Sequence, residues 1–254
     1  VPTAGSVKID GSNLGSALAG TIAATRLSAN TTSAFSIAKY TGNDTAGATV
    51  AHGLGVAPEL VIIKNLTNAQ SWAVTSPELG TTGDTTGGLA EYYMLALDTT
   101  AARADYSQDN IFGLTSTTFS VGSSGSMNEV NNSSYSYVAY CFASIEGYSK
   151  VGSYTGNGNA DGTFVYCGFR PAYVLVRATN TVTNWNVANN KMPEYNVTNL
   201  YLTPNTTAAQ SEEAFADLLS NGFKFRNTST SFNAAYNYLF YAVAESPFKT
   251  SNAR

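Results

Sequence analysis

AFSIAKYTGN at residues 34–43 and GYSKVGSYTGN at residues 147–157 are two versions of one stretch of sequence. Downstream of each, a second pair corresponds in the same order: GLGVAPELVIIK at residues 53–64 and GFRPAYVLVR at residues 168–177. Both pairs place a short polar turn before an apolar run, which is typical of successive strands. Two matches in one order predict that the chain contains two copies of one domain.

The correspondence continues to the C-terminal part of each copy, where YSYVAYCFASIEGY at residues 135–148 is matched by YNYLFYAVAESPF at residues 236–248. Tyr40 and Tyr154 are 114 positions apart, whereas the tyrosines of the last pair are 101 apart. The length differences therefore fall between the matched blocks, where loops tolerate them. A unit of about a hundred residues is too long for a solenoid repeat. A residue present in only one copy is a weak candidate for shared chemistry.

The pattern within each copy predicts an all-β fold. ELVIIK at residues 59–64 and AYVLVR at residues 172–177 are short apolar runs with β-branched residues, as in buried strands. YSYVAYCFASI at residues 135–145 carries bulky side chains on both alternating faces, which favours a central strand. NDTAG at residues 43–47 and NGNADG at residues 157–162 are turn sequences. We predict two tandem antiparallel β-sandwich, jelly-roll-like domains from an internal duplication.

The domain boundaries follow from the repeat. Residues 34–146 form copy 1 and residues 147–249 form copy 2, followed by a C-terminal tail at residues 250–254. Residues 1–33 contain no aromatic residue and are dominated by Ala, Gly, Ser and Thr. This composition favours an extended N-terminal arm or connector, with a floppy tail as the alternative. The short linker IEGYSK at residues 145–150 predicts that the two domains behave as one rigid unit with cooperative unfolding.

One helix is predicted in copy 2, over SEEAFADLLSNG at residues 211–222. Ser211 is a suitable N-cap, and the two glutamates after it suit the first turn. Phe215 and Leu218 lie on one helical face, and Gly222 is in place to end the helix.

Composition excludes several classes of protein. Charged residues are 12% of the chain and the net charge is −4, with no basic cluster, so nucleic acid is not an expected partner. The longest apolar run is too short for membrane insertion. Hydrophobic residues make up 43% and aromatic residues 12%, which is too much apolar surface for a disordered chain.

Cys141 and Cys167 occupy non-equivalent places, because they align with Ala242 and His52 of the other copy. Two cysteines make neither a zinc set nor a disulfide framework. We expect both to be small buried hydrophobic residues. A bridge between them stays an open alternative.

No catalytic residues are predicted. His52 is the only histidine, and no nucleophile elbow, phosphate loop or zinc-protease motif accompanies it. Paired carboxylates would be needed for a glycosidase, and of the acidic candidates only Glu78 and Glu194 match between the copies. One shared carboxylate is not a catalytic pair, so a polysaccharide hydrolase is a distant alternative. The other candidates are Asp84, Glu91, Asp98, Asp105, Asp161, Glu212 and Glu213.

Neither a metal nor a cofactor is expected. The spacing Asn157-x-Asn159-x-Asp161-Gly162 mimics the start of a calcium loop, but Gly168 stands where a bidentate glutamate would close the site. A hairpin turn that uses Asn and Gly at positive φ is the favoured interpretation.

Trp72 and Trp185 are the candidate ligand-contact aromatics, since an exposed indole is a good platform for a sugar. Both occur at the same place in the repeat, so we favour their role as core anchors. Sixteen tyrosines, together with many Asn, Ser and Thr residues, are typical of surfaces that contact glycans or neighbouring subunits.

The run YVAYCFASIEGYSKVGSYTGNGNADGTFVYCGFRPAYVLVR at residues 137–177 resembles a domain of unknown function found in tail-fibre and other virion proteins of tailed bacteriophages, many of them marine. The likeness covers about residues 34–248. It departs from the family's pattern after Arg177, where ATNTVTNW replaces the usual charged pair. Residues 15–28, GSALAGTIAATRLS, resemble the linkers that precede such domains.

The resemblance implies a non-enzymatic structural protein on the virion surface, assembled in the host cytoplasm. It would be a tail fibre or appendage, or a capsid decoration or head-fibre protein, and the short chain favours decoration. Its expected partners are other copies of itself, with a trimer as the default, and other virion proteins. A host-surface glycan is the further partner, and a carbohydrate-binding adhesin module is the alternative function.

Overall fold

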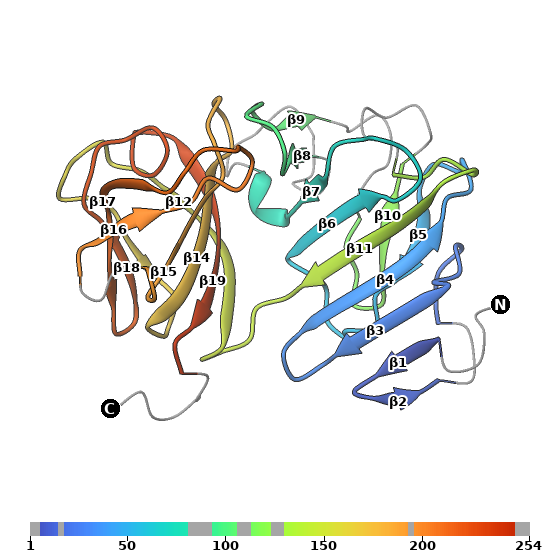
Figure 1. Ribbon diagram of the computed structural model, residues 1–254. Coiled ribbons are helices and arrows are strands. Elements are labelled where there is room, and N and C mark those ends of the chain that lie inside the picture. Colours follow the sequence, from blue (N-terminus) through green and yellow to red (C-terminus); the bar gives the residue numbers. More distant parts are fainter. Residues whose placement is uncertain are drawn as a thin grey trace. The chain divides into compact units, whose positions relative to one another are not determined.

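The computed structural model describes residues 6–14, 18–80, 93–105, 113–122, 130–192 and 196–246. Within these residues the chain is all-β, with strands in several sheets, one short 3-10 turn and no α-helix, so the predicted class is confirmed (Figure 1). The chain divides into two compact units. Unit 1 comprises Val1–Leu97 and Ala104–Ala143, and unit 2 comprises Asp98–Arg103 and Ser144–Arg254.

Unit 1 contains a nine-stranded sheet in the order β2-β1-β3-β4-β11-β6-β7-β8-β9 and a two-stranded sheet in which β10 pairs with β5. The pairing is antiparallel apart from that of β1 with β3. The elements are β1 Val7–Ile9, β2 Ser12–Asn13, β3 Arg26–Asn30, β4 Phe35–Thr41, β5 Ala48–Ala51, β6 Leu60–Asn65, β7 Ala73–Thr75, η1 Pro77–Leu79, β8 Tyr93–Ala96, β9 Ala104–Asp105, β10 Thr118–Val121 and β11 Ser136–Phe142.

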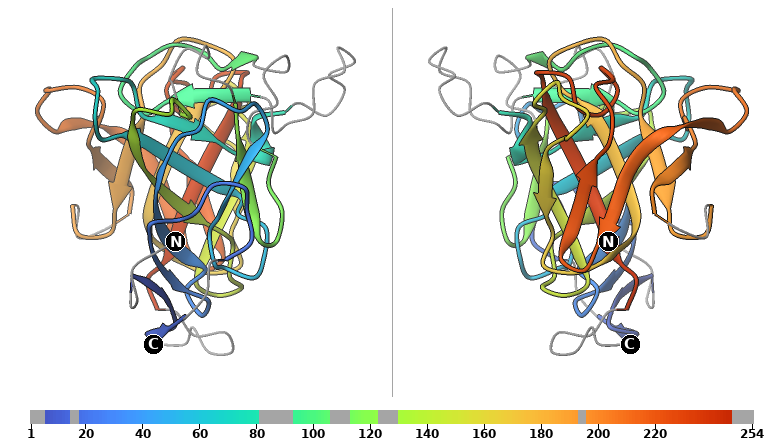
Figure 2. Two further views of the ribbon diagram at one scale, coloured as in Figure 1. Left: turned by 90° about the vertical axis from the view of Figure 1, so that its right-hand side faces the viewer. Right: turned by 90° about the vertical axis from the view of Figure 1, so that its left-hand side faces the viewer.

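Unit 2 contains two four-stranded antiparallel sheets, in the orders β12-β19-β14-β15 and β13-β18-β17-β16. Its strands are drawn from yellow to red in Figure 2. The elements are β12 Ser149–Thr155, β13 Phe164–Tyr166, β14 Pro171–Ala178, β15 Asn186–Asn189, β16 Thr198–Tyr201, β17 Ser211–Leu219, β18 Gly222–Phe225 and β19 Asn237–Ala244.

Each unit buries aromatic rings between its sheets, which makes the arrangement β-sandwich-like. In unit 1, Tyr40 stacks on Tyr137 at 5.1 Å between centroids and meets Phe119 of β10 at 6.1 Å. In unit 2, Tyr154 stacks on Tyr238 at 4.8 Å and meets Phe223 at 6.4 Å. Rings brought together in this way add about 0.5–1.5 kcal/mol per pair beyond the area they bury.

The central strand predicted in each copy is confirmed. β11 lies between β4 and β6, and β19 lies between β12 and β14. Because a central strand has neighbours on both edges, its backbone is fully paired, and side chains on both of its faces are covered. Cys141 on β11 is accordingly buried, and Tyr140 on the opposite face is half-buried.

The segment expected as an extended arm is largely part of unit 1, so that expectation is wrong for its described residues. β3 pairs with β4 from Arg26↔Lys39 to Asn30↔Phe35, and β1 pairs with β3. Leu27 and Ala29 alternate toward the core and are buried. The absence of aromatic residues misled the prediction, because small aliphatic side chains are sufficient to cover the rim of a core that is filled by tyrosines from other strands.

The helix predicted at residues 211–222 is also wrong. Ser211–Leu219 forms β17 and pairs with both β16 and β18. Gly222 does not end a helix but begins β18, where an added Cβ would lie 2.1 Å from Val165 O of the neighbouring strand. Tertiary pairing on both edges of β17 satisfies the backbone that a helix would have satisfied locally, so propensity is overridden.

β4 in unit 1 and β12 in unit 2 are held to the loop before the last strand of their unit by the same set of contacts. Tyr40 Oη donates to Val130 O at 2.7 Å, and Tyr154 Oη donates to Phe232 O at 2.7 Å. The next residue in each loop is a fully buried asparagine, Asn131 or Asn233. Asn131 Oδ1 accepts from Asn43 N at 2.9 Å, and Asn233 Oδ1 accepts from Asn157 N at 3.3 Å.

A glycine accompanies each buried asparagine for steric reasons. An added Cβ would lie 2.3 Å from Asn132 O at Gly42 and 2.0 Å from Ala234 O at Gly156. No side chain fits at such distances, so only glycine allows the strand end to approach this loop so closely. The paired strands also have one order in both units, β4-β11-β6-β7 and β12-β19-β14-β15.

Candidate functional site

The two tryptophans predicted as ligand-contact candidates each lie beneath a cation at the end of an apolar strand. In unit 2, the guanidinium of Arg177 lies over the Trp185 ring at 5.3 Å, and both side chains are fully buried. In unit 1, Lys64 Nζ lies over the Trp72 ring at 5.5 Å. Stacking of this kind is worth about 0.5–2 kcal/mol, more where water is excluded.

The site in unit 2 is closed by residues 99–101, which are distant from Arg177 in the sequence but belong to the same unit. Arg177 Nη1 donates to Thr99 O at 2.6 Å, and Nη2 donates to Ala101 O. Thr183 N donates to Thr100 O at 3.1 Å. Burial lowers the pKa of Arg177 to about 10, and the carbonyl oxygens supply the partners that make a buried cation tolerable. Trp185 is therefore a core residue with no face for a ligand.

The site in unit 1 is more open. Trp72 is half-buried and stacks on Tyr140 at 6.3 Å between centroids. Lys64 is also half-buried, and its ammonium donates to Gln70 O. Leu66 in the following loop is 52% exposed. Of the two tryptophans, Trp72 is the one placed for contact with a ligand or partner.

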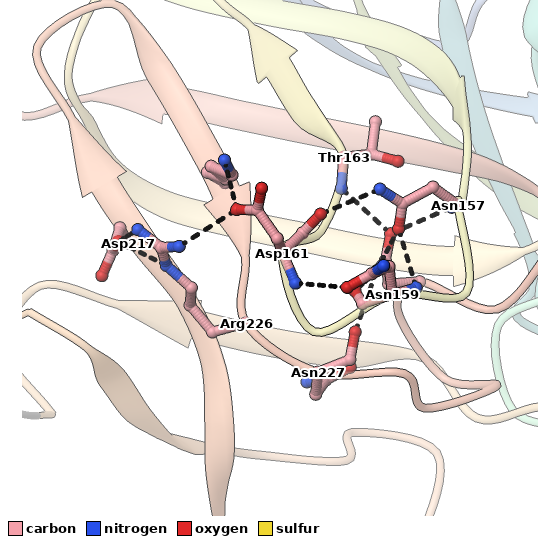
Figure 3. Close-up of polar contacts among 9 residues, drawn as sticks. Asn157, Asn159, Asp161, Thr163, Asp217, Arg226 and Asn227 are labelled. Atoms are coloured by element: carbon pink, nitrogen blue, oxygen red, sulfur yellow. Dashed lines mark hydrogen bonds and ion pairs between the residues drawn. The ribbon is translucent and has the colours of Figure 1, made fainter.

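The loop that mimics a calcium site uses its oxygens internally (Figure 3). Asn157 Oδ1 accepts from Asn159 N at 2.9 Å and from Asn233 Nδ2 at 2.9 Å. Asn159 Oδ1 accepts from Asp161 N at 2.9 Å. Gly158 has a φ of 65°, so the turn uses glycine in the left-handed region as predicted. The prediction of a hairpin is wrong, because β12 pairs with β19 and β13 pairs with β18, in different sheets.

The Asp161 carboxylate faces two cationic side chains (Figure 3). Lys224 Nζ lies 2.6 Å and Arg226 Nη1 3.5 Å from Asp161 Oδ1. The hydrogen bond from Lys224 is the main cause that lowers the pKa of Asp161. Arg226 Nε also donates to Asp217 Oδ2 at 2.6 Å. Within the described residues no group of three or more His, Cys, Asp or Glu side chains is arranged to hold a metal ion.

Next to this loop, β13 presents two aromatic side chains to solvent. Phe164 is 43% exposed and Tyr166 is 59% exposed, while Val165 between them is buried. Lys150 Nζ lies over the Tyr166 ring at 5.3 Å and donates to Tyr166 O at 3.1 Å. β13 pairs with β18 alone, so this aromatic pair lies at a sheet edge. Sequence reasoning did not single out either residue.

His52 is fully buried, and its ring is fixed by backbone groups. Leu54 N donates to Nδ1 at 3.2 Å, so Nε2 carries the proton and donates to Thr115 O at 3.1 Å. Burial lowers the pKa of His52, although the bond to Thr115 opposes this shift. The imidazole is thus a neutral structural group.

A pH dependence of stability follows from His52. The unfolded chain binds a proton at this residue as the pH falls below about 6.5, before the folded protein does, so the free energy of unfolding decreases there. His52→Gln should be less stable at neutral pH, yet lose less further stability on acidification. Urea unfolding of both proteins at a series of pH values measures this difference, and parallel slopes would contradict it.

Both cysteines are buried and free, as small hydrophobic residues were expected to be. Burial raises the pKa of Cys141 and of Cys167 to about 12 in each case, so neither is a thiolate at neutral pH.

The acidic candidates that the structure describes come from different elements, among them η1, β9 and β17. Asp84, Glu91 and Glu194 lie outside the described residues. Glu78 lies in η1, where its backbone N–H donates to the Ser76 hydroxyl oxygen at 3.2 Å. The side chains of Asp98, Asp105, Glu212 and Glu213 lie on the exposed surface.

Two features with a structural role were missed by the sequence reasoning, although the repeat contains their signal. Lys64 and Arg177 each precede their tryptophan by eight positions. Asn131 and Asn233 each precede the last strand of their copy by a similar number of residues. A charged or amide residue retained at one place in both copies is an indication of a buried polar partner.

In the part of the chain described by the structure, no helix has the length and apolarity needed to span a bilayer. A family model matches residues 9–247, and its description is "Domain of unknown function (DUF7483)". No curated protein and no solved structure matches the chain.

Proposed function

The chain belongs to the DUF7483 family, whose description assigns no activity, and we propose that it is a non-enzymatic structural protein exposed on the surface of a virion. The observation that carries this proposal is the common framework of the two units. The polar side chains that were weighed for chemistry, such as His52 and Asn157, are used to hold that framework together. We infer that the side chains left at the surface serve for contacts with other proteins.

The proposal includes an internal duplication that makes two β-sandwich-like domains in tandem. It is supported by the equal order of four strands in both units and by the paired contacts of Tyr40 with Val130 O and Tyr154 with Phe232 O. These residues are matched in the sequence repeat as well. Two β-sandwich-like domains of independent origin would not be expected to have the same hydrogen bond at aligned positions of their sequences. A common origin of the two units is therefore the simplest explanation.

The virion assignment comes from the resemblance to bacteriophage tail-fibre and other virion proteins. We propose a capsid decoration, head-fibre or tail-appendage protein that acts as a homo-oligomer, with a trimer favoured, and that contacts other virion proteins. Low charge supports this, because a surface solubilised by amides and hydroxyls can be covered by neighbours with little desolvation cost.

The test is the position of the chain in purified particles. Particles are purified by density gradient, the chain is identified by mass spectrometry, and immunogold labelling locates it. We expect labelling at the capsid or at the tail of intact particles. A chain that is made during infection but is absent from purified particles would overturn the proposal. So would release of reducing sugar from host polysaccharide that Glu78→Gln abolishes, because the proposed protein is not an enzyme.

A carbohydrate-binding adhesin is the second candidate, favoured by the exposed Phe164 and Tyr166 on β13. If it is correct, Phe164→Ala with Tyr166→Ala should lower glycan-array binding at least tenfold, since stacked aromatic rings carry much of the energy of such contacts. Val182→Ala is the matched control, because Val182 is 67% exposed elsewhere in unit 2. Binding that survives the double substitution, or no binding by the wild type, excludes a glycan site at β13.

A further inference from the structure

Two surface segments of this chain have similar sequences and share one local hydrogen bond. LDTTAA at residues 97–102 corresponds to PNTTAA at residues 204–209. In the first, Ala101 N donates to Thr99 Oγ1 at 3.4 Å, and in the second, Ala208 N donates to Thr206 Oγ1 at 3.2 Å. Each segment begins beside the tryptophan of its own copy. Leu97 N donates to Trp72 O at 3.0 Å, and Trp185 N donates to Asn205 Oδ1 at 3.0 Å.

The surroundings of the two segments differ. The first belongs to unit 2, where its carbonyl oxygens accept from Arg177 and from Thr183 N, and Arg103 N donates to Thr179 O at 2.8 Å. The second is an exposed turn, and every residue from Thr206 to Gln210 is exposed. Residues 98–102 therefore cover the site formed by Arg177 and Trp185. Residues 206–210 are exposed and cover no corresponding site within the same chain.

The receiving site also exists twice. Lys64 and Trp72 stand where Arg177 and Trp185 stand in unit 2. The loop that follows is held in the same way, since Leu66 N donates to Ser136 O at 2.8 Å and Thr179 N donates to Asn237 O at 2.8 Å. Leu66 and Gln70 thus occupy the positions of Thr179 and Thr183, whose backbone groups bind the first segment.

We propose that residues 205–210 of one copy of this chain cover the Lys64–Trp72 site of a second copy. Within a single chain, residues 206–210 are exposed, and Lys64 and Trp72 are only half-buried. A contact between two copies of the chain would cover both surfaces at once. The proposal rests on the duplication included in the proposed function, and it supplies the contact through which the homo-oligomer forms. It does not depend on where in the virion the oligomer is located.

The expected chemistry follows the closed site of unit 2. The Lys64 ammonium donates to a carbonyl oxygen of the arriving segment, at Thr206 or Ala208, and Leu66 loses contact with water. An ammonium is a point charge and does not reproduce the two directed bonds of the guanidinium. The contact between chains is therefore weaker than the one that Arg177 makes, which suits a joint that forms during assembly.

The proposed contact is head-to-tail, because the segment and the site are different surfaces. Head-to-tail contacts close into rings or continue as filaments. In a ring, the segment of each sequence copy would cover the tryptophan of the copy that follows it, alternately within one chain and between two chains. A homotrimer would then contain six closed sites.

A directional disulfide test distinguishes this contact from any other. Thr183 N bonds Thr100 O at 3.1 Å in unit 2, and the corresponding residues of the proposed contact are Gln70 and Thr207. Two full-length variants, Gln70→Cys and Thr207→Cys, are oxidised separately and as a mixture. We expect a covalent two-chain product in the mixture and little in either protein alone. Cys141 and Cys167 are buried and do not interfere.

The control mixture pairs Thr207→Cys with Val182→Cys, which is exposed in unit 2. Equal cross-linking in the control mixture, or none in the test mixture at concentrations where the chain sediments as an oligomer, overturns the proposal. A chain that sediments as a monomer at every accessible concentration also overturns it. Failure here would leave particle location, the test of the proposed function, unaffected.

A second measurement uses a variant that leaves the fold intact. Ala208 is exposed, so Ala208→Glu should unfold like the wild type, but its dissociation constant for self-association should rise at least about tenfold. Ala160→Glu is the matched control, at an exposed alanine in another loop of unit 2. Equal self-association of the two variants contradicts the assigned segment.

Discussion

Asn233→Ala is expected to lower the free energy of unfolding by about 3–4 kcal/mol, because several buried hydrogen bonds are lost and each is worth about 1 kcal/mol net. Asn233 is fully buried. Its Nδ2 donates to Asn159 O at 2.7 Å and to Asn227 O at 2.8 Å, as well as to Asn157 Oδ1. Its Oδ1 accepts from Thr163 N at 3.2 Å. Alanine leaves these groups without their partner.

The expected loss is a large part of the 5–15 kcal/mol by which domains are ordinarily stable. Urea unfolding of the full chain measures it. The matched control is Asn159→Ala, because Asn159 is exposed in the loop that Asn233 binds, and its Oδ1 accepts from Asp161 N at 2.9 Å. We expect about 1 kcal/mol or less for the control. A cost for Asn233→Ala no greater than that of the control would show that the loop does not hold unit 2 together.

Asn131→Ala tests the same framework in unit 1. Asn131 Nδ2 donates to Thr45 O at 2.8 Å and to Gly122 O at 2.7 Å. With three bonds in place of five, the expected cost is smaller, at about 2–3 kcal/mol. Similar behaviour of the two asparagines would support their origin in one ancestral unit.

Arg177→Ala should cost about 3–5 kcal/mol, because it removes a large buried side chain that packs on the Trp185 ring and takes away the side-chain donors to the carbonyl oxygens of Thr99 and Ala101. Arg177→Lys restores the residue type that unit 1 uses at this place, so it should recover part of the loss. Urea unfolding gives the stability, and hydrogen exchange at Thr183 N–H reports whether residues 98–103 detach.

Lys64→Ala is the matched control in unit 1. Lys64 is half-buried, so its loss should cost about 1 kcal/mol or less. If Arg177→Ala is no more destabilising than Lys64→Ala, the segment at residues 98–103 is not a structural part of unit 2.

The assignment of residues 98–103 to unit 2 sharpens the prediction of cooperative unfolding. A cut between residues 143 and 144 leaves this segment on the N-terminal fragment, so unit 2 loses the acceptors of Arg177. We expect the C-terminal fragment by itself to be less stable than unit 2 in the intact chain. Two well-separated thermal transitions, each reproduced by an isolated fragment, would contradict this.

The sequence by itself determined the all-β class and the central strands. Alternation in YSYVAYCFASI and continuous apolar runs such as ELVIIK depend on the two-residue period of a strand, which is a local property. It also determined the burial of both cysteines and the glycine turn at Asn157–Asp161, since residue size and backbone freedom decide these. Tyr40 and Tyr154 were aligned with each other from the sequence, and each donates its hydroxyl proton to a backbone carbonyl in the loop before the last strand of its unit.

Only the tertiary structure decided whether β17 is a strand, because the helix-favouring SEEAFADLL finds hydrogen-bond partners on both edges in β16 and β18. It alone decided that β3 joins the sheet of unit 1, since burial of small side chains depends on what lies against them. The different burial of Trp72 and Trp185 has the same origin. The sequences around the two tryptophans are similar. Residues 98–103, which are distant in sequence, cover the site of Trp185, whereas Trp72 is half-buried.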